Sequence, residues 1–146
     1  MTRSKNFWRK TAILAAAGAF AFWVANFAIS RTPIAAEYRA ALSISYLPML
    51  LEALIGGLLI GTCVSFFLVR FFEKIPTKDP IMKSLMLTLF VLILVTILIG
   101  GPSSYLATGN VWRYFAIGTT INIIRILALG MTIGILYNKT GGGMQK

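Results

Sequence analysis

The chain has 146 residues, of which 58% are hydrophobic and 12% are charged, and its mean hydropathy is +0.81. Soluble domains carry about a quarter charged residues, so this composition excludes an ordinary soluble domain and indicates a membrane protein. The net charge of +10 at pH 7 fits nucleic-acid binding in principle, but the positions of the cations relative to the apolar segments favour another explanation.

Four long apolar stretches predict four membrane-spanning helices. Each has roughly the 17–25 residues that a helix needs to cross a hydrocarbon core about 30 Å thick. A transmembrane barrel is not expected, because barrel strands have about ten residues of alternating polarity. The predicted spans are residues 11–30, 47–69, 84–101 and 114–137. The predicted fold is therefore all-α, a single four-helix membrane bundle that occupies residues 1–146.

Span one, residues 11–30, has a basic start and an alanine-rich run, which are also features of a signal peptide. Its apolar region is longer than the usual stretch of about 7–15 residues, and no good small-x-small cleavage site follows it. We therefore expect the span to be retained. Cleavage, the alternative, would leave three spans and place the new N-terminus outside.

The first outer loop has the sequence RTPIAAEYRAALSISYLP. It opens with a proline turn and continues with an alanine-rich stretch that is compatible with a short helix on the membrane surface. In such a helix Tyr38, Ala41 and Leu42 would face the lipid at helical spacing. An ordinary connector is the alternative.

Span two contains the clearest packing motif, LIGGLLIGTCVSF. Gly57 and Gly61 form a Gly-x-x-x-Gly pair and Gly56 widens the flat face, which favours close approach of a neighbouring helix. Span one has similar faces made of Ala15, Ala17, Ala19 and Ala21. The faces of the two spans are expected either to pack on each other or to mediate homodimerisation.

The single cysteine, Cys63, excludes an intramolecular disulfide and is expected to be a small buried apolar residue.

The inner loop, EKIPTKDPIMK, is short and has two prolines, so it predicts a firm hairpin between spans two and three. The second outer loop, GGPSSYLATGN, is rich in turn formers and is followed by Trp112 and Arg113, which suit the membrane interface.

The cations are distributed unevenly between the two predicted sides of the membrane. By the positive-inside rule both termini and the loop between spans two and three are cytoplasmic, as in a multi-pass protein of the inner membrane. The orientation of the chain in the membrane thus accounts for its excess of basic residues, and nucleic acid is not an expected partner. The expected partners are the lipid bilayer and anionic headgroups at the cytoplasmic face, attracted by about 1 kcal/mol per cation. The ten cations on this side are Arg3, Lys5, Arg9, Lys10, Arg70, Lys74, Lys78, Lys83, Lys139 and Lys146, and the opposite side has Arg31, Arg39 and Arg113.

Arg125 lies at the centre of span four, in TTINIIRILALG. A charged side chain that faces lipid at this depth costs about 2.5–3.5 kcal/mol, so Arg125 is expected to face protein or water. Glu52 is the only intramembrane carboxylate and the expected charged partner, with Asn122 as a bridge one turn above Arg125. Asn26, Thr96 and Thr119 fall at a depth similar to that of Glu52. The predicted polar cluster is Arg125, Asn122, Glu52, Asn26, Thr119 and Thr96.

Two functions are compatible with this cluster. If the cluster is a structural network, or if Arg125 pairs with a carboxylate of another protein, the chain is an accessory, assembly or interaction subunit of a membrane complex. If Arg125 holds an anionic headgroup, carboxylate or phosphate, the chain is a small, homodimeric transporter or a lipid- or anion-binding protein. The first function is our leading hypothesis.

An enzyme is not expected. The sequence has no histidine, which removes the usual general base and metal ligand. Its four carboxylates, Glu37, Glu52, Glu73 and Asp79, are scattered over both loops and one span, so no pair of acids is predicted to meet. The sequence shows no phosphate-binding loop or metal motif, so neither a metal nor a cofactor is expected.

Overall fold

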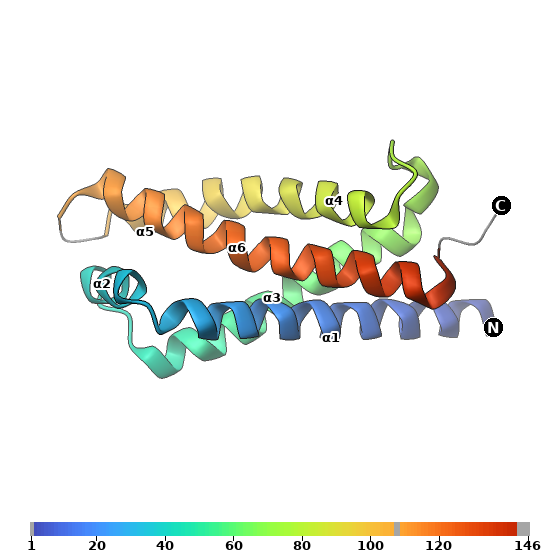
Figure 1. Ribbon diagram of the computed structural model, residues 1–146, viewed down its shortest axis with the longest axis horizontal. Coiled ribbons are helices and arrows are strands. Elements are labelled where there is room, and N and C mark those ends of the chain that lie inside the picture. The colour runs from blue at the N-terminus through green and yellow to red at the C-terminus, as the bar shows by residue number, and fades with distance from the viewer. Residues whose placement is uncertain (1, 107–108, 143–146) are drawn as a thin grey trace.

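A computed structural model describes the backbone of residues 2–106 and 109–142, and all regular structure in these residues is helical. Four long apolar helical segments run along the length of the molecule, and each is long and apolar enough to cross a membrane (Figure 1). The predicted all-α architecture with four apolar helices is confirmed. The segments are α1 (Thr2–Ser30), α3 (Tyr46–Arg70), α4 (Pro80–Val95) with the π-helical turn η2 (Thr96–Gly100), and α6 (Val111–Tyr137) with the π-helical turn η3 (Asn138–Gly142).

All four helices begin earlier than predicted, α3 by one residue and the other three by three residues or more. The basic segment before span one is itself helical, so α1 begins at Thr2 rather than at residue 11. The α4 helix begins at Pro80 because Asp79 caps it: its Oδ1 accepts the Ile81 N–H at 2.9 Å, and proline suits the first helical position. The α6 helix begins at Val111, after Asn110, whose side chain accepts the Arg113 N–H at 3.2 Å.

The third span also ends differently from the prediction. Its last turn, η2, is π-helical, and the helix α5 (Gly101–Ser104) follows it directly, so GGPSS is not part of a loop. Pro102 lacks an N–H and its ring clashes with the carbonyl four residues earlier in an α-helix. A wider turn of the i→i+5 type, in which the Gly101 N–H bonds to the Thr96 carbonyl, relieves this conflict.

A short helix occupies the segment between α1 and α3. It is α2 (Pro33–Ala41), and the Thr32 side chain caps it by accepting the Ala35 N–H at 3.3 Å. Of the two alternatives for this segment, the structure has the helix, but not with the orientation expected of it: Ala41 is buried, and Tyr38 packs on Gly118 of α6. A Cβ at Gly118 would lie 2.6 Å from the Tyr38 hydroxyl, so the missing side chain makes room for the ring.

The small-residue faces of α1 and α3 pack on each other within one molecule. A Cβ built on Gly61 would lie 2.8 Å from the Ala15 carbonyl oxygen, and one on Gly57 would lie 3.3 Å from the Ala19 carbonyl oxygen. Gly56 lies outside this contact, because a Cβ there would meet nothing within 4 Å. Two of the three glycines thus let the two backbones approach closely, as small residues do between membrane helices.

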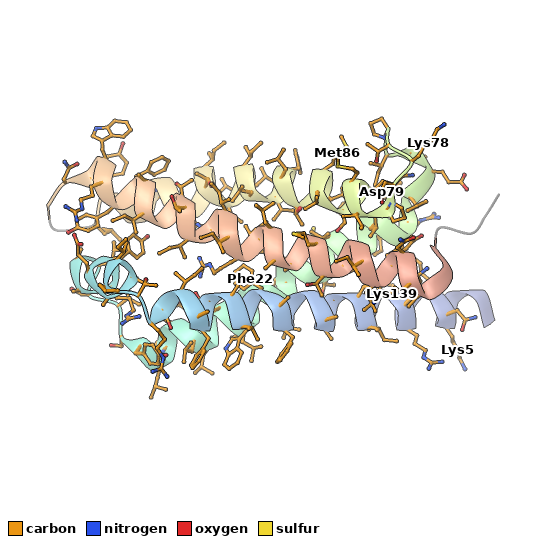
Figure 2. All side chains as sticks on the ribbon, viewed as in Figure 1. Lys5, Phe22, Lys78, Asp79, Met86 and Lys139 are labelled. Carbon is orange, nitrogen blue, oxygen red and sulfur yellow. The ribbon has the colours of Figure 1, made fainter. Side chains whose placement is uncertain are left out.

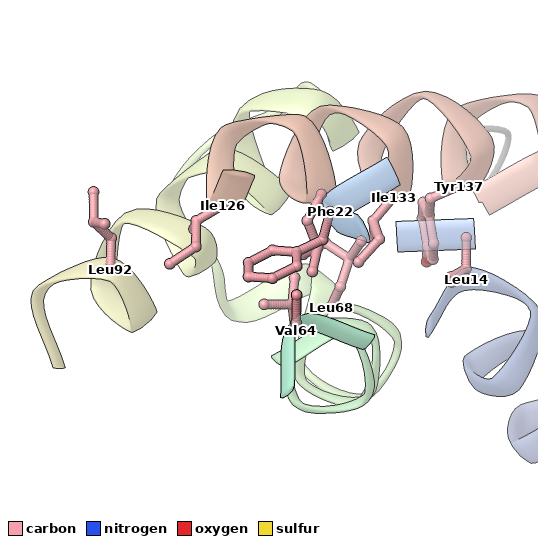
Figure 3. Close-up of a cluster of buried hydrophobic side chains, with 10 residues drawn as sticks. Leu14, Phe22, Val64, Leu68, Leu92, Ile126, Ile133 and Tyr137 are labelled. Atoms are coloured by element: carbon pink, nitrogen blue, oxygen red, sulfur yellow. The ribbon is translucent and has the colours of Figure 1, made fainter. Parts of the chain in front are cut away.

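The apolar core follows the middle of the bundle and receives side chains from all four long helices (Figure 3). The α4 and α6 helices approach through Gly130, beside Thr88, and Gly134, beside Ser84, whose hydroxyl donates to the Gly130 carbonyl at 2.7 Å. Many large apolar side chains point outward, as suits a bundle surrounded by lipid. Core side chains that are at most 1% exposed are Leu14, Ala19, Val64, Leu68, Ile126, Leu129 and Ile133.

The α1–α3 contact generates a prediction about Gly61. We expect Gly61→Ala to destabilise the bundle by about 1–3 kcal/mol, the usual effect of overpacking, because its methyl group would meet rigid backbone. Gly56→Ala is the matched control: it makes the same change on the same helix in open space and is expected to leave stability unchanged. Thermal unfolding in detergent measures both, and equal melting temperatures for the two variants would contradict the packing described here.

Candidate functional site

Arg125 is the centre of a partly buried polar group between α1 and α6. Its Nη1 donates to the Asn26 Oδ1 at 2.7 Å, and its Nη2 donates to the Asn122 Oδ1. The guanidinium carbon lies 5.0 Å from the centroid of the Phe22 ring, within cation–π range. Phe22 lies between α1 and α6, near the middle of the molecule (Figure 2). Two amide oxygens and one aromatic face therefore hold the cation.

Local helix geometry explains why these side chains meet. Phe22 and Asn26 are one turn apart on α1, and both are buried, at 5% and 3% exposure. Asn122 and Arg125 are three residues apart on α6, which places their side chains on neighbouring parts of one face. Packing of α1 against α6 then brings the two pairs together.

No carboxylate pairs with Arg125 among the residues that the structure describes, which include all four acidic side chains. Glu52 does not join the cluster. It is exposed on α3, beside Leu51 and Ile55, which are 63% and 59% exposed. The reason is the orientation of α3: its Ala53 and glycine face is turned toward the protein, so Glu52 points outward.

Three polar atoms of the predicted cluster are buried without a hydrogen-bond partner in the described structure. They are Arg125 Nε, Asn26 Nδ2 and Thr119 Oγ1. Thr119 precedes Asn122 by three residues on α6. A buried donor that stays unpaired costs about 1–3 kcal/mol, and more when it is charged. The site therefore has two N–H groups and one hydroxyl that an acceptor-rich group would satisfy.

Thr96, the sixth predicted member, is half-buried at the start of η2. No hydrogen bond joins its side chain to Arg125 or to either asparagine in the part of the chain described here. The structure thus brings Arg125, Asn122 and Asn26 into contact, places Thr119 one turn away, and leaves Glu52 and Thr96 apart from them.

Two contributors, Phe22 and Tyr38, were missed by the sequence reasoning. Tyr38 lies over Gly118, one turn above Asn122. The position of Gly118 in a stripe with Asn122 and Arg125 was the available signal for a close neighbour, and Phe22 was indicated only by its helical spacing from Asn26.

The short helix α2 covers the end of the bundle where α1 ends and α6 begins (Figure 1). Side chains on two sides of α2 bind it to the long helices. Glu37 forms an ion pair with Arg113 of α6 at 3.0 Å. Arg39 donates to the Ser30 carbonyl at 2.9 Å and lies 5.0 Å from the centroid of the Tyr46 ring. These contacts position Tyr38 above the polar cluster, and they tie α2 to α1, α3 and α6.

No group of three or more histidine, cysteine or acidic side chains gathers within the described ranges, so the site offers no set of metal ligands there. Cys63, which was expected to be buried, is exposed on α3. The sequence matches no protein-family model, and neither a curated protein nor a solved structure is similar enough to match it. The chemistry of the site has to be inferred from its own geometry.

The contact between Arg125 and Asn26 generates a second prediction. Asn26→Leu leaves the Arg125 Nη1 without an acceptor and is expected to destabilise the protein by about 1–3 kcal/mol. In combination with Arg125→Leu, the additional effect of Asn26→Leu is expected to be smaller by about 1 kcal/mol or more, because the two side chains interact. Denaturant unfolding of the two single variants and the double variant measures this coupling. Strict additivity would mean that the hydrogen bond contributes nothing.

Proposed function

We propose that this chain is a non-enzymatic, multi-pass protein of a cytoplasmic membrane that binds an anionic group at Arg125. Both termini are cytoplasmic in this proposal. Four apolar helices of sufficient length support membrane insertion. The start of α1, the end of α6 and the hairpin before α4 all lie at one end of the bundle, where Lys5, Lys78 and Lys139 cluster (Figure 2). The positive-inside rule then favours a cytoplasmic location for that end.

The observation that carries the proposal is the uncompensated charge of Arg125. Its two hydrogen-bond partners are neutral amides, so they satisfy two N–H groups without neutralising the cation. A buried cation without a counter-charge is costly in a membrane interior, and such positions commonly mark ligand or transport sites. An anion at this position would supply the missing charge.

The unpaired donors indicate the class of anion. A carboxylate or phosphate has several acceptor oxygens, and arginine recognises either of them through more than one N–H. Arg125 Nε and Asn26 Nδ2 are both available as donors, and the Thr119 hydroxyl provides a third. We therefore assign the chain to the small transporters or to the lipid- or anion-binding proteins, with an amphiphilic carboxylate or phosphate as its ligand.

A native mass measurement of gently extracted protein tests this function. We expect the wild-type chain to carry an anionic ligand and Arg125→Gln to lose it, with occupancy lower by about tenfold or more, since a hydrogen bond to a charged group contributes about 1.5–3 kcal/mol. Arg31→Gln is the control, because it removes one cation from the same end of the bundle at an exposed position. Equal occupancy in folded Arg125→Gln protein, or equal losses in both variants, would contradict the proposal.

A second candidate function is that of an accessory or interaction subunit, and the position of Glu52 favours it. This carboxylate is exposed among outward-facing apolar side chains of α3 and has no partner among the described residues. Gly56, one turn further along the same face, is open. A partner helix could pack against α3 in the open space beside Gly56. A cation or hydrogen-bond donor on that helix, at the depth of Glu52, would remove the cost of a lipid-exposed acid.

Glu52→Gln tests this second function. We expect the variant to lose a complex that wild-type protein forms in its native membrane, because the amide retains the shape of the side chain and lacks the charge. Glu73→Gln is the matched control, since Glu73 is an exposed acid at the opposite end of the molecule. Native gel electrophoresis of mild extracts reports the size of the complex, and an unchanged size for Glu52→Gln would exclude a charge-dependent contact on α3.

A further inference from the structure

A second cationic site lies far from Arg125, where α1 begins and α6 ends. A cavity of about 220 Å³ opens there between the two helices. We call its polar and cationic lining residues the rim and its two apolar lining residues, the half-exposed Ile13 and the buried Leu14, the floor. The lining residues are Asn6, Arg9, Lys10, Ile13, Leu14 and Thr140.

The two cations of the rim have no anionic partner in the described structure. Arg9 is exposed and Lys10 is half-buried, and neither forms an ion pair with a carboxylate there. The hairpin before α4 contains two acidic residues, Glu73 and Asp79. Neither of them is among the described residues that line the cavity. Among the described residues that line the cavity, the charged ones are both cations.

Lys10 is positioned by aromatic rings rather than by an acid. Its Nζ lies 3.9 Å from the centroid of the Tyr137 ring. Tyr137 stacks on Phe72 with centroids 4.9 Å apart, and the Lys83 Nζ lies 3.7 Å from the Phe72 centroid. Cation–π contacts hold an ammonium in place without neutralising it. Lys10 is thus held against an aromatic face and has no carboxylate partner among the described residues.

The apolar floor distinguishes a lipid from a soluble anion. Ile13 and Leu14 lie one turn further along α1 than Arg9 and Lys10, and Leu14 is buried. A phosphate with the glycerol and first acyl carbons of a lipid would place its charge at the rim and its apolar part on this floor. Free phosphate would leave the floor unused.

We infer that Asn6, Arg9 and Lys10 bind the phosphate group of a glycerophospholipid in the leaflet that surrounds this end of the bundle. A lipid of net negative charge is preferred, because the cavity has no acid to receive the cation of a zwitterionic headgroup. The site is independent of Arg125 and of any ligand bound there.

Titration of delipidated full-length protein with phosphatidylglycerol, followed by native mass spectrometry, tests the site. We expect one tightly bound lipid in wild-type protein, and phosphatidylcholine with the same acyl chains to bind several-fold more weakly. The double variant Arg9→Gln/Lys10→Gln should weaken phosphatidylglycerol binding by roughly tenfold or more, since each interfacial cation contributes substantially to anionic-lipid affinity. The control Lys74→Gln/Lys78→Gln removes the same charge from the exposed hairpin and should change binding by less than about twofold.

A third variant separates the cavity from general charge effects. Ile13→Trp retains every cation and fills the floor, so it should weaken phosphatidylglycerol binding in folded protein. Equal losses in the two double variants, or equal binding of the two lipids, would overturn the inference. Displacement of the lipid by glycerol 3-phosphate at equal concentration would show that the site binds soluble phosphate and would overturn its assignment to a lipid.

Discussion

The close backbone contact between α1 and α3 is the constraint on which the rest of the molecule depends. Helices in an apolar surrounding gain little from the hydrophobic effect, so they associate where small side chains let backbones touch. Gly61 over Ala15 and Gly57 over Ala19 provide such a contact and fix the rotation of both helices. Asn26 follows Ala19 by seven residues, about two turns, so it lies on nearly the same face of α1, where it meets Arg125. With α3 turned in this way, Glu52 faces outward, so the same contact that assembles the polar cluster leaves it without an acid.

Residue depth could be predicted from the sequence, whereas helix rotation could be predicted only in part. Hydropathy located the four long helices, and helical spacing paired Asn122 with Arg125. Glu52 was assigned to the cluster on depth alone. It precedes Gly57 by five residues, and at about 100° per residue the two side chains point some 140° apart on the helix. Once Gly57 faces α1, Glu52 has to face away, and Cys63 is turned outward by the same rotation.

Other features depend on contacts that no local pattern specifies. The loop after span one was compatible with a helix, but the packing of Tyr38 depends on the gap that Gly118 leaves on a helix far along the chain. The π-helical turn before Gly101 arises from a conflict between Pro102 and the preceding turn, which hydropathy does not register. The aromatic pair of Phe72 and Tyr137 likewise joins two segments that only the tertiary fold brings together.

The neutral partners of Arg125 have a chemical consequence of their own. A carboxylate at position 26 or 122 would satisfy the same N–H groups and would also cancel the charge, which would close the site as an internal ion pair. Amide oxygens satisfy the geometry and leave the net charge in place. The chain has 14 basic and four acidic residues, so most of its cations are balanced by something other than its own acids. For exposed cations, water and counter-ions serve this purpose. Arg125 is only partly exposed beside Phe22 and Asn26, so its charge is screened less by water and salt than the charge of a fully exposed cation.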